Sequence, residues 1–313
     1  MSYVRYVKYT QYVGFVFPLF PPRRLAMNAS EFQSSRKFVQ TAFGRIAFVE
    51  RGNGPVALFA HALPLCGYQW RYALDEVSSM RTCVAPDLMG LGYSEIPARQ
   101  DISYESQARM LAALLDARSI KQVDLIGNDT GGGVSQIFLA LYPERVRSLT
   151  LTNCEVHDLW PNAMLQQFYA ALKAGLVGEA LKNITRDPSS AAQLAATYEN
   201  PESLTKEALE VYFGPFVDSE QRREQLKGFS EAERNRDQLV AAAKGLRTSQ
   251  IPAQVLWGDA DTAFDTSASI DWLKRNLGGL RKVTTIPRAK LFWPEEHPRL
   301  LTVLLKEFWS GLD

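Results

Sequence analysis

Short apolar runs alternate with amphipathic stretches between residues 37 and 155. The apolar runs are rich in β-branched residues and end at turn signals, which is typical of strands. The pattern predicts strands at 45–50, 56–61, 82–86, 123–128 and 149–154, and helices at 103–118 and 134–142. Strands that alternate with helices are typical of an α/β fold with a mostly parallel central sheet and flanking helices.

The periodicity changes at His157. From there to residue 247, strand-like runs are replaced by helical segments rich in Ala, Leu and Gln and interrupted by proline. The alternating pattern then returns, with strands at 253–257 and 282–286, a helix at 267–277 and a terminal helix after Pro298. We therefore predict a core formed by residues 37–156 and 248–313, with a helical cap inserted at 157–247.

Residues 1–36 form an N-terminal arm in this prediction. Their apolar run at 12–20 is too short to span a bilayer, and Pro18 interrupts it. No small-residue cleavage site follows the run convincingly, so the segment does not resemble a signal peptide. We expect the arm to pack on the body or on a second subunit, and attachment to a membrane surface is the alternative.

The charge balance favours a small or apolar ligand. The 313 residues include 35 Lys or Arg and 34 Asp or Glu, so no broad electrostatic field favours nucleic acid or an acidic partner. Hydrophobic residues make up 46% of the chain, which is enough for a sizeable core. These features leave the oligomeric state open.

Three cysteines, Cys66, Cys83 and Cys154, lie far apart and form no CxxC or metal-ligand spacing. Two of them fall within apolar runs, so we expect reduced, structural thiols in a cytoplasmic protein. The histidines are too few and too scattered for a metal site, and no nucleotide-binding glycine fingerprint follows the first strand. The sequence therefore predicts neither a metal nor a cofactor.

The strand at 123–128 leads directly into Gly127-Asn128-Asp129-Thr130-Gly131-Gly132, and a helix leads out of this turn. A side chain at such a turn is exposed beside the helix N-terminus, and glycines permit the tight backbone. Asp129 is therefore the candidate nucleophile, and the backbone N–H groups of Leu63 and Thr130 are the expected oxyanion hole. The alternative is a glycine-rich helix start in which Asp129 is only the N-cap.

Three motifs occur in order along the chain. They are His61-Ala62-Leu63-Pro64 with Gln69-Trp70-Arg71, then Ala85-Pro86-Asp87-Leu88-Met89-Gly90-Leu91-Gly92-Tyr93-Ser94, then Asp129. Together they resemble the epoxide hydrolases and haloalkane dehalogenases of the α/β-hydrolase superfamily, and the resemblance extends from Phe43 to Trp309. It implies that Asp129 attacks an alkyl carbon and that an activated water hydrolyses the resulting ester.

The resemblance also implies an acid partner after the strand that follows the cap, in a pattern like Trp-Gly-x-x-Asp. Trp257-Gly258-Asp259-Ala260-Asp261 fits this pattern, so Asp261 is the candidate acid. Asp259 and Asp265 remain alternatives, and so does a solvated loop position for Asp261.

One catalytic residue of that family has no counterpart here. Its histidine stands in a phrase like Pro-x-Ala-Gly-His-Phe, whereas this chain has Leu291 in the phrase Pro-Arg-Ala-Lys-Leu-Phe, and leucine cannot activate water. Of the three histidines, we expect His61 to support the oxyanion loop and His297 to lie at the surface. His157 is the best candidate for an unusual base, and a hydrogen-bonded cap hinge is the alternative for it.

Other departures concern the substrate. Haloalkane dehalogenases resemble one another in a tryptophan that follows the nucleophile and helps to hold halide. This chain has Thr130 at that position, so dehalogenation is disfavoured. Ala62 replaces the usual glycine of the oxyanion loop. Epoxide hydrolases use cap tyrosines to protonate the epoxide oxygen. The candidate substrate-binding residues are His61, Trp70, Trp160, Tyr169, Tyr198, Tyr212, Phe292 and Trp293.

Three functions remain open at this stage. The first is a hydrolase most like an epoxide hydrolase, acting on a small or medium apolar substrate with Asp129 as nucleophile. The second is an isomerase, cyclase or lyase in which Asp129 is a general acid or base. The third is a ligand-binding member of the fold without catalysis, because a fold alone does not determine a reaction.

Overall fold

The computed structural model describes residues 27–312. The apolar run predicted as part of the N-terminal arm lies outside these residues. The strands are β1 (Arg36–Thr41), β2 (Gly44–Arg51), β3 (Val56–Ala60), β4 (Thr82–Pro86), β5 (Val123–Gly127), β6 (Val146–Thr152), β7 (Ala253–Gly258) and β8 (Leu280–Ile286). The helices are α1 (Ala29–Ser34), α2 (Arg71–Val77), α3 (Tyr104–Ala117), α4 (Thr130–Leu141), α5 (Ala163–Lys173), α6 (Leu176–Ile184), α7 (Ala192–Ala195), α8 (Lys206–Val217), α9 (Glu220–Leu226), α10 (Ala232–Thr248), α11 (Thr266–Asn276), α12 (Trp293–Glu296) and α13 (Pro298–Ser310).

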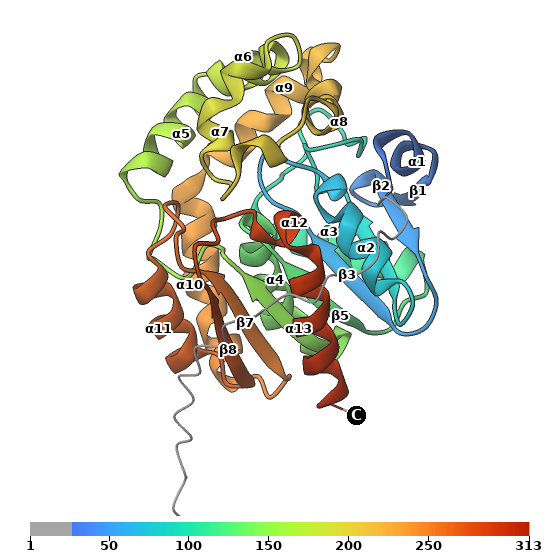
Figure 1. Cartoon of the computed structure of the whole chain (residues 1–313), viewed down its shortest axis with the longest axis vertical. Helices are drawn as coiled ribbons and strands as arrows, with labels where there is room; N and C mark the ends of the chain where they lie inside the picture. The colour runs from blue at the N-terminus through green and yellow to red at the C-terminus, as the bar shows by residue number, and fades with distance from the viewer. Residues whose placement is uncertain (1–26, 313) are drawn as a thin grey trace, which may run out of the picture.

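These strands form one sheet in the order β1-β2-β4-β3-β5-β6-β7-β8 (Figure 1). β1 and β4 both pair antiparallel with β2, and the remaining pairs are parallel. The central strand β5 is buried at every position, which explains why it appears in the sequence as a continuous apolar run. The predicted α/β class with a mostly parallel sheet is confirmed. β1 was not predicted as a separate strand, because no position along it is buried.

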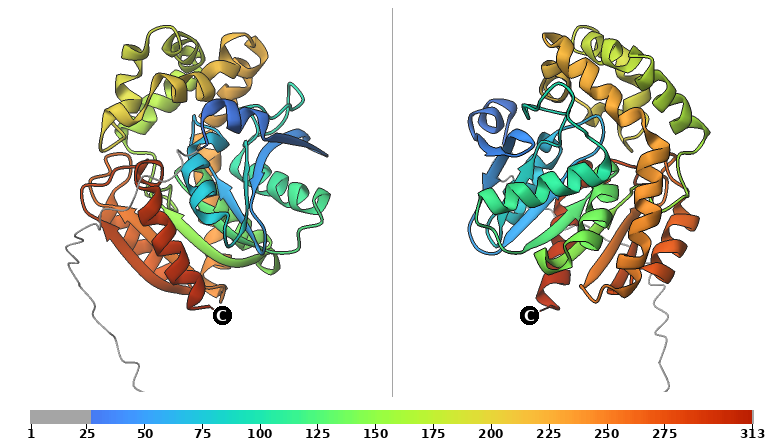
Figure 2. Two further views of the ribbon diagram at one scale, coloured as in Figure 1. Left: turned by 45° about the vertical axis from the view of Figure 1, so that its right-hand side comes forward. Right: turned by 180° about the vertical axis from the view of Figure 1, so that it is seen from behind.

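Helices cover both faces of the sheet. α3, α4 and α10 pack together on one face, whereas α2 and α13 pack on the other (Figures 1 and 2). Parallel strands buried on both sides require such a double layer, because neither face can be left to water. Among residues 27–312, no helix is long and apolar enough to cross a membrane.

A second, smaller group of helices, α5 to α9, lies beyond one end of the sheet (Figure 1). The predicted cap at 157–247 contains these helices, but it also contains α10, which packs along α4 beside the sheet (Figure 2). A Cβ atom added at Gly245 of α10 would lie 2.8 Å from the Cβ of Ala140, so the two helices approach closely. The helical periodicity of α10 does not distinguish a cap helix from a core helix, which is why the predicted boundary was placed after it.

A buried ion pair within the core also holds two tyrosines of the cap segment. Arg71 of α2 donates to Glu295 of α12 over 2.6 Å, and their side chains are 4% and 2% exposed. Tyr198 and Tyr212 of the cap segment also donate to the Glu295 carboxylate, each over 2.8 Å. A buried charge requires such partners, because water is not available to solvate it.

Replacing Glu295 with glutamine is therefore expected to lower the free energy of unfolding by about 3 kcal/mol, because Arg71 would remain charged and buried without its anion. Urea unfolding at pH 7 would measure this loss. The matched control is Glu105→Gln, which breaks the exposed Glu105–Arg109 pair and should cost less than about 1 kcal/mol. Equal losses in the two variants would contradict the prediction.

Candidate functional site

Asp129 lies between the end of β5 and the start of α4. Its backbone has φ 53° and ψ −129°, a conformation that side-chain-bearing residues rarely adopt and that is strained. A Cβ atom at Gly131 would overlap the carbonyl oxygen of Ala60, so this position of the turn requires glycine. The backbone N–H of Asp129 donates to the Asn153 carbonyl oxygen over 2.7 Å. The turn is thus a tightly held elbow that places one carboxylate at the carboxyl edge of the sheet.

The backbone N–H groups of both predicted oxyanion-hole residues act on the Asp129 carboxyl. The N–H of Leu63 donates to Oδ2 over 2.9 Å, and the backbone N–H groups of Thr130 and Leu63 both lower the pKa of the carboxyl. The side chain makes no capping hydrogen bond to α4, although the residue occupies the N-cap position. The two N–H groups therefore converge on the carboxylate itself, where they can stabilise negative charge.

His61 holds the loop that carries Leu63. Its Nδ1 lies 2.9 Å from the Ala62 carbonyl oxygen, and its Nε2 accepts the backbone N–H of Leu88 over 2.8 Å. This pattern fits a neutral ring with its proton on Nδ1, and burial lowers the pKa of His61. The ring nitrogens are thus used in backbone hydrogen bonds.

Glu155 is a functional candidate that the sequence reasoning missed. It follows β6 and is 1% exposed. Its Oε1 accepts the hydroxyl of Tyr104 over 2.8 Å and that of Thr130 over 3.1 Å, while its buried Oε2 has no hydrogen-bond partner among residues 27–312. Burial raises the pKa of Glu155 to about 7. The available signal was an acidic residue just after a strand whose carboxyl end faces the elbow.

The Asp129 and Glu155 carboxyls affect each other. Burial raises the pKa of Asp129 well above its usual value, the charge of Glu155 raises it further, and the N–H groups of Thr130 and Leu63 oppose this rise. Two carboxyls that interact in a buried site titrate as a pair and resist double ionisation. Near neutral pH the site therefore exchanges a proton readily, which is the property required of an acid or base.

Asp261 lies at the same edge of the sheet, at the loop after β7. Its Oδ2 accepts the side-chain amide of Asn153 over 2.8 Å, and its Oδ1 accepts the backbone N–H of Ala263 over 2.8 Å. Burial raises the pKa of Asp261. Because the Asn153 carbonyl oxygen also accepts the N–H of Asp129, one asparagine connects both aspartates.

The two alternatives to Asp261 make local structural contacts. Asp259 accepts the backbone N–H of Arg288 over 2.7 Å. Asp265 caps the N-terminus of α11 by accepting the N–H of Ala268.

Leu291 is buried in the segment where the resemblance implies a histidine. Its carbonyl oxygen accepts the side-chain amide of Asn128 over 3.0 Å. The next two residues are also buried: Phe292 packs on Tyr198 at 5.0 Å between ring centroids, and Trp293 donates to Asn153 over 3.1 Å. This segment is an apolar wall beside the elbow.

The other two histidines bond to neighbours outside the Asp129 site. His157 lies 2.6 Å from the carboxylate of Asp158 and stacks on Trp272 at 4.8 Å between ring centroids. His297 lies 2.8 Å from the Glu199 carboxylate. Residues 27–312 include all three histidines, and no imidazole among them hydrogen bonds the Asp129 carboxylate. The predicted base His157 is thus not brought to Asp129 by these contacts.

The predicted aromatic residues separate into two groups. Trp160 stacks on Tyr104 at 5.8 Å and lies 5.8 Å from the ring of Tyr169. Burial raises the pKa of Tyr169, and the charges of Glu155 and Asp129 raise it further, so this tyrosine lies near both acids. Tyr198 and Tyr212 instead donate to Glu295. Trp70 belongs to neither group. Its ring is buried and packs against Phe59, with 5.4 Å between the ring centroids.

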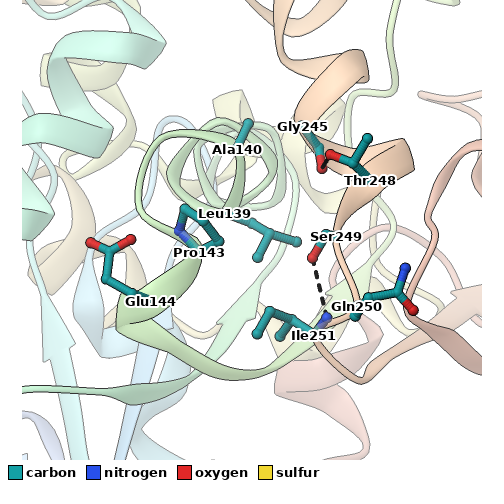
Figure 3. A pocket seen from close by; sticks show the side chains of 9 residues that line it. All are labelled: Leu139, Ala140, Pro143, Glu144, Gly245, Thr248, Ser249, Gln250 and Ile251. Atoms are coloured by element: carbon teal, nitrogen blue, oxygen red, sulfur yellow. Dashed lines mark hydrogen bonds between the residues drawn. The ribbon is translucent and has the colours of Figure 1, made fainter.

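A surface hollow of about 370 Å³ lies away from these residues (Figure 3). Its lining includes Pro143 and Glu144 before β6 and Gln250 and Ile251 before β7, so it lies at the amino ends of those strands. Ligands of α/β sheets bind at the carboxyl ends, which is where Asp129 stands. The hollow is therefore not the Asp129 site.

Comparison with known proteins gives a consistent result. The family model described as alpha/beta hydrolase fold matches residues 55–287. A cis-3-alkyl-4-alkyloxetan-2-one decarboxylase of Shewanella oneidensis is 26% identical over 247 residues, covering 76% of this chain and 77% of that protein. Haloalkane dehalogenase 2 of Mycobacterium tuberculosis is 24% identical over 302 residues, covering 92% and 97% of the two chains. The solved structure of the epoxide hydrolase CorEH without ligand has a TM-score of 0.74 at 19% identity, covering 89% of this chain and 99% of that one.

Proposed function

The chain belongs to the α/β hydrolase fold family, in the branch that includes epoxide hydrolases and haloalkane dehalogenases, and on this premise we propose that it hydrolyses a neutral, apolar epoxide through Asp129. The supporting observation is the elbow carboxylate, whose Oδ2 is fixed by the N–H of Leu63. Oδ2 would become the carbonyl oxygen of an ester formed through Oδ1.

The first step forms a carbon–oxygen bond between Asp129 Oδ1 and an epoxide carbon. The ring carbon–oxygen bond breaks, and the released oxygen takes the proton of Tyr169. This tyrosine stays protonated at neutral pH because burial and the nearby carboxylates raise its pKa. The product is an alkyl ester of Asp129, and no water is consumed in this half.

The second step cleaves the ester with water, and Glu155 takes the place of the missing imidazole. Water attacks the Asp129 carboxyl carbon and gives its proton to Glu155, while Leu63 and Thr130 stabilise the oxyanion on Oδ2. The alkyl oxygen then leaves as the second hydroxyl of the diol, taking the proton from Glu155, and the proton of the regenerated Asp129 carboxyl returns to Tyr169. A base is most effective when its pKa lies near the working pH, and the pKa of Glu155, about 7, meets this condition.

A single turnover in H₂¹⁸O tests this proposal. We expect intact-mass spectrometry with a panel of neutral epoxides to detect an adduct of the epoxide's mass, and peptide analysis to locate ¹⁸O on Asp129 after release. The isotope enters the aspartate because water attacks the carboxyl carbon and not the alkyl carbon. Diol formed without ¹⁸O on Asp129 would contradict the covalent route, and no diol from any epoxide would contradict the substrate class.

The missing imidazole favours a second candidate, the decarboxylation of a β-lactone. The related decarboxylase acts on a cis-3-alkyl-4-alkyloxetan-2-one, as its name states. Conversion of such a ring into an alkene and carbon dioxide consumes no water, so no water-activating base is required. Incubation with a cis-dialkyl oxetan-2-one and gas chromatography of the alkene would test it.

Leu291→His distinguishes the two candidates. It places an imidazole where the resemblance implies one, so ester hydrolysis is expected to be at least about tenfold faster if the hydrolase proposal holds. Stopped-flow quench and intact-mass spectrometry would measure ester lifetime. Leu291→Asn is the control, because it adds polarity without a base. An unchanged ester lifetime in Leu291→His would argue against a hydrolytic second step, and unchanged alkene production would favour the decarboxylase.

A further inference from the structure

We infer that Gln69 is a positioning residue that fixes the direction of the Leu63 N–H toward the Asp129 carboxylate. Gln69 precedes α2 and lies within one of the motifs that carry the family resemblance. Its side chain donates or accepts hydrogen bonds with Ala62 and Asn128, and neither bond reaches the Asp129 carboxylate. Gln69 therefore acts through these two neighbours.

The Gln69 amide holds the oxyanion loop. It is 1% exposed, and its Oε1 accepts the backbone N–H of Ala62 over 2.9 Å. The next N–H along the chain is that of Leu63, which donates to Asp129 Oδ2 over 2.9 Å. Because successive peptide planes share a Cα atom, fixing the Ala62 N–H restricts the direction in which the Leu63 N–H can point.

The other end of the same amide holds the elbow. Gln69 Nε2 donates to Asn128 Oδ1 over 2.6 Å, and Asn128 directly precedes Asp129. Asn128 Nδ2 in turn donates to the carbonyl oxygens of Asn153 and Leu291, over 3.1 Å and 3.0 Å. The Asn153 carbonyl oxygen also accepts the Asp129 N–H. One buried amide therefore sets the oxyanion loop and the elbow relative to each other.

An apolar side chain at position 69 would leave the Ala62 N–H and the side-chain Oδ1 of Asn128 buried without the partners that Gln69 supplies. The two loops would then shift to recover hydrogen bonds, because unpaired buried polar groups are costly. A longer Leu63 to Asp129 contact stabilises the carboxylate less, so the pKa of Asp129 should rise. The same loss weakens stabilisation of the oxyanion, and this second consequence rests on the proposed function.

The test is a titration of the Asp129 carboxyl in Gln69→Leu by ¹³C NMR of protein with labelled aspartate. The Asp129 resonance is identified by its absence from Asp129→Asn. We expect its midpoint to move to higher pH than in the wild type, and ester hydrolysis to slow about tenfold with a larger effect on kcat than on KM. If Gln69→Leu does not fold, Gln69→Met keeps the unbranched stem and serves in its place.

Gln254→Leu is the matched control. Gln254 is another fully buried glutamine, bonded to Thr150 within the sheet, and its removal should leave the Asp129 midpoint unchanged. An Asp129 midpoint that does not move in Gln69→Leu, or that moves equally in both variants, would overturn the inference. The titration requires no substrate, so it tests the role of Gln69 even if epoxides are not turned over. If the Asp129 midpoint rises in Gln69→Leu but no ester forms with any epoxide, only the proposed function is rejected.

Discussion

Asp129→Asn is expected to abolish the epoxide adduct and to lower turnover by about 10⁴-fold or more. The amide keeps the size of the side chain and an oxygen for the Leu63 N–H, but it is a very poor nucleophile. The expected result is therefore a folded protein without chemistry. Intact-mass spectrometry and diol chromatography would measure both effects.

Folding of this variant should not be impaired. The neutral amide removes the repulsion between Asp129 and Glu155, which raises the pKa of Asp129 in the wild type. Thermal unfolding at pH 8 is expected to show equal or higher stability. Asp265→Asn is the matched control, because asparagine can still cap α11 and turnover should stay unchanged. Retention of the adduct in Asp129→Asn would exclude Asp129 as the nucleophile.

Glu155→Gln is expected to slow ester hydrolysis by about 10²- to 10³-fold, so that the ester accumulates. The glutamine can still accept the Tyr104 hydroxyl, but it cannot take a proton from water. In the wild type, hydrolysis should increase as pH rises through about 7, because the base must be ionised and the pKa of Glu155 is about 7. This pH dependence should disappear in the variant, whereas Glu105→Gln at the surface should keep it.

The same variant should gain stability at alkaline pH. The folded-state pKa of Glu155 is raised above its ordinary value of 4.5, so protonation favours the folded state. This stabilisation is complete below about pH 4.5 and is lost as pH rises through about 7. Glutamine has no proton to lose, so Glu155→Gln should be more stable than the wild type at pH 8, by roughly 1–3 kcal/mol. A variant with slower ester hydrolysis but lower stability at pH 8 would contradict this account of the buried charge.

The sequence predicts the sheet and the elbow because both depend on local features. Buried parallel strands are continuous apolar runs, and the turn at Asp129 requires glycine where backbone atoms approach closely. Glu155 was missed because its place shortly after β6 is the only local signal, and no motif around it distinguishes it from other acidic residues. Its significance depends on Tyr104, which is far away in the chain and meets it only in the folded protein.

The roles of the cap tyrosines could not be predicted for the same reason. Tyr169, Tyr198 and Tyr212 have similar helical surroundings in the sequence. Two of them bind Glu295, which lies at the far end of the core sequence, and one lies near the paired acids. His157 likewise stacks on Trp272, a residue of the second core segment. Long-range contacts such as these determine which side chains reach the site.

Asp129, Glu155 and Asp261 also determine which charge a ligand of this site can carry. No salt bridge joins any of these three carboxyls to a cation within residues 27–312. A fatty acid or other anion would lose its hydration on entering and would find no cation in these three carboxyls, which repel it when they are ionised, and this is unfavourable in a buried site. The carboxyls thus select against anionic ligands. Free acids would be poor inhibitors, whereas neutral amides and alcohols of the same shape could bind.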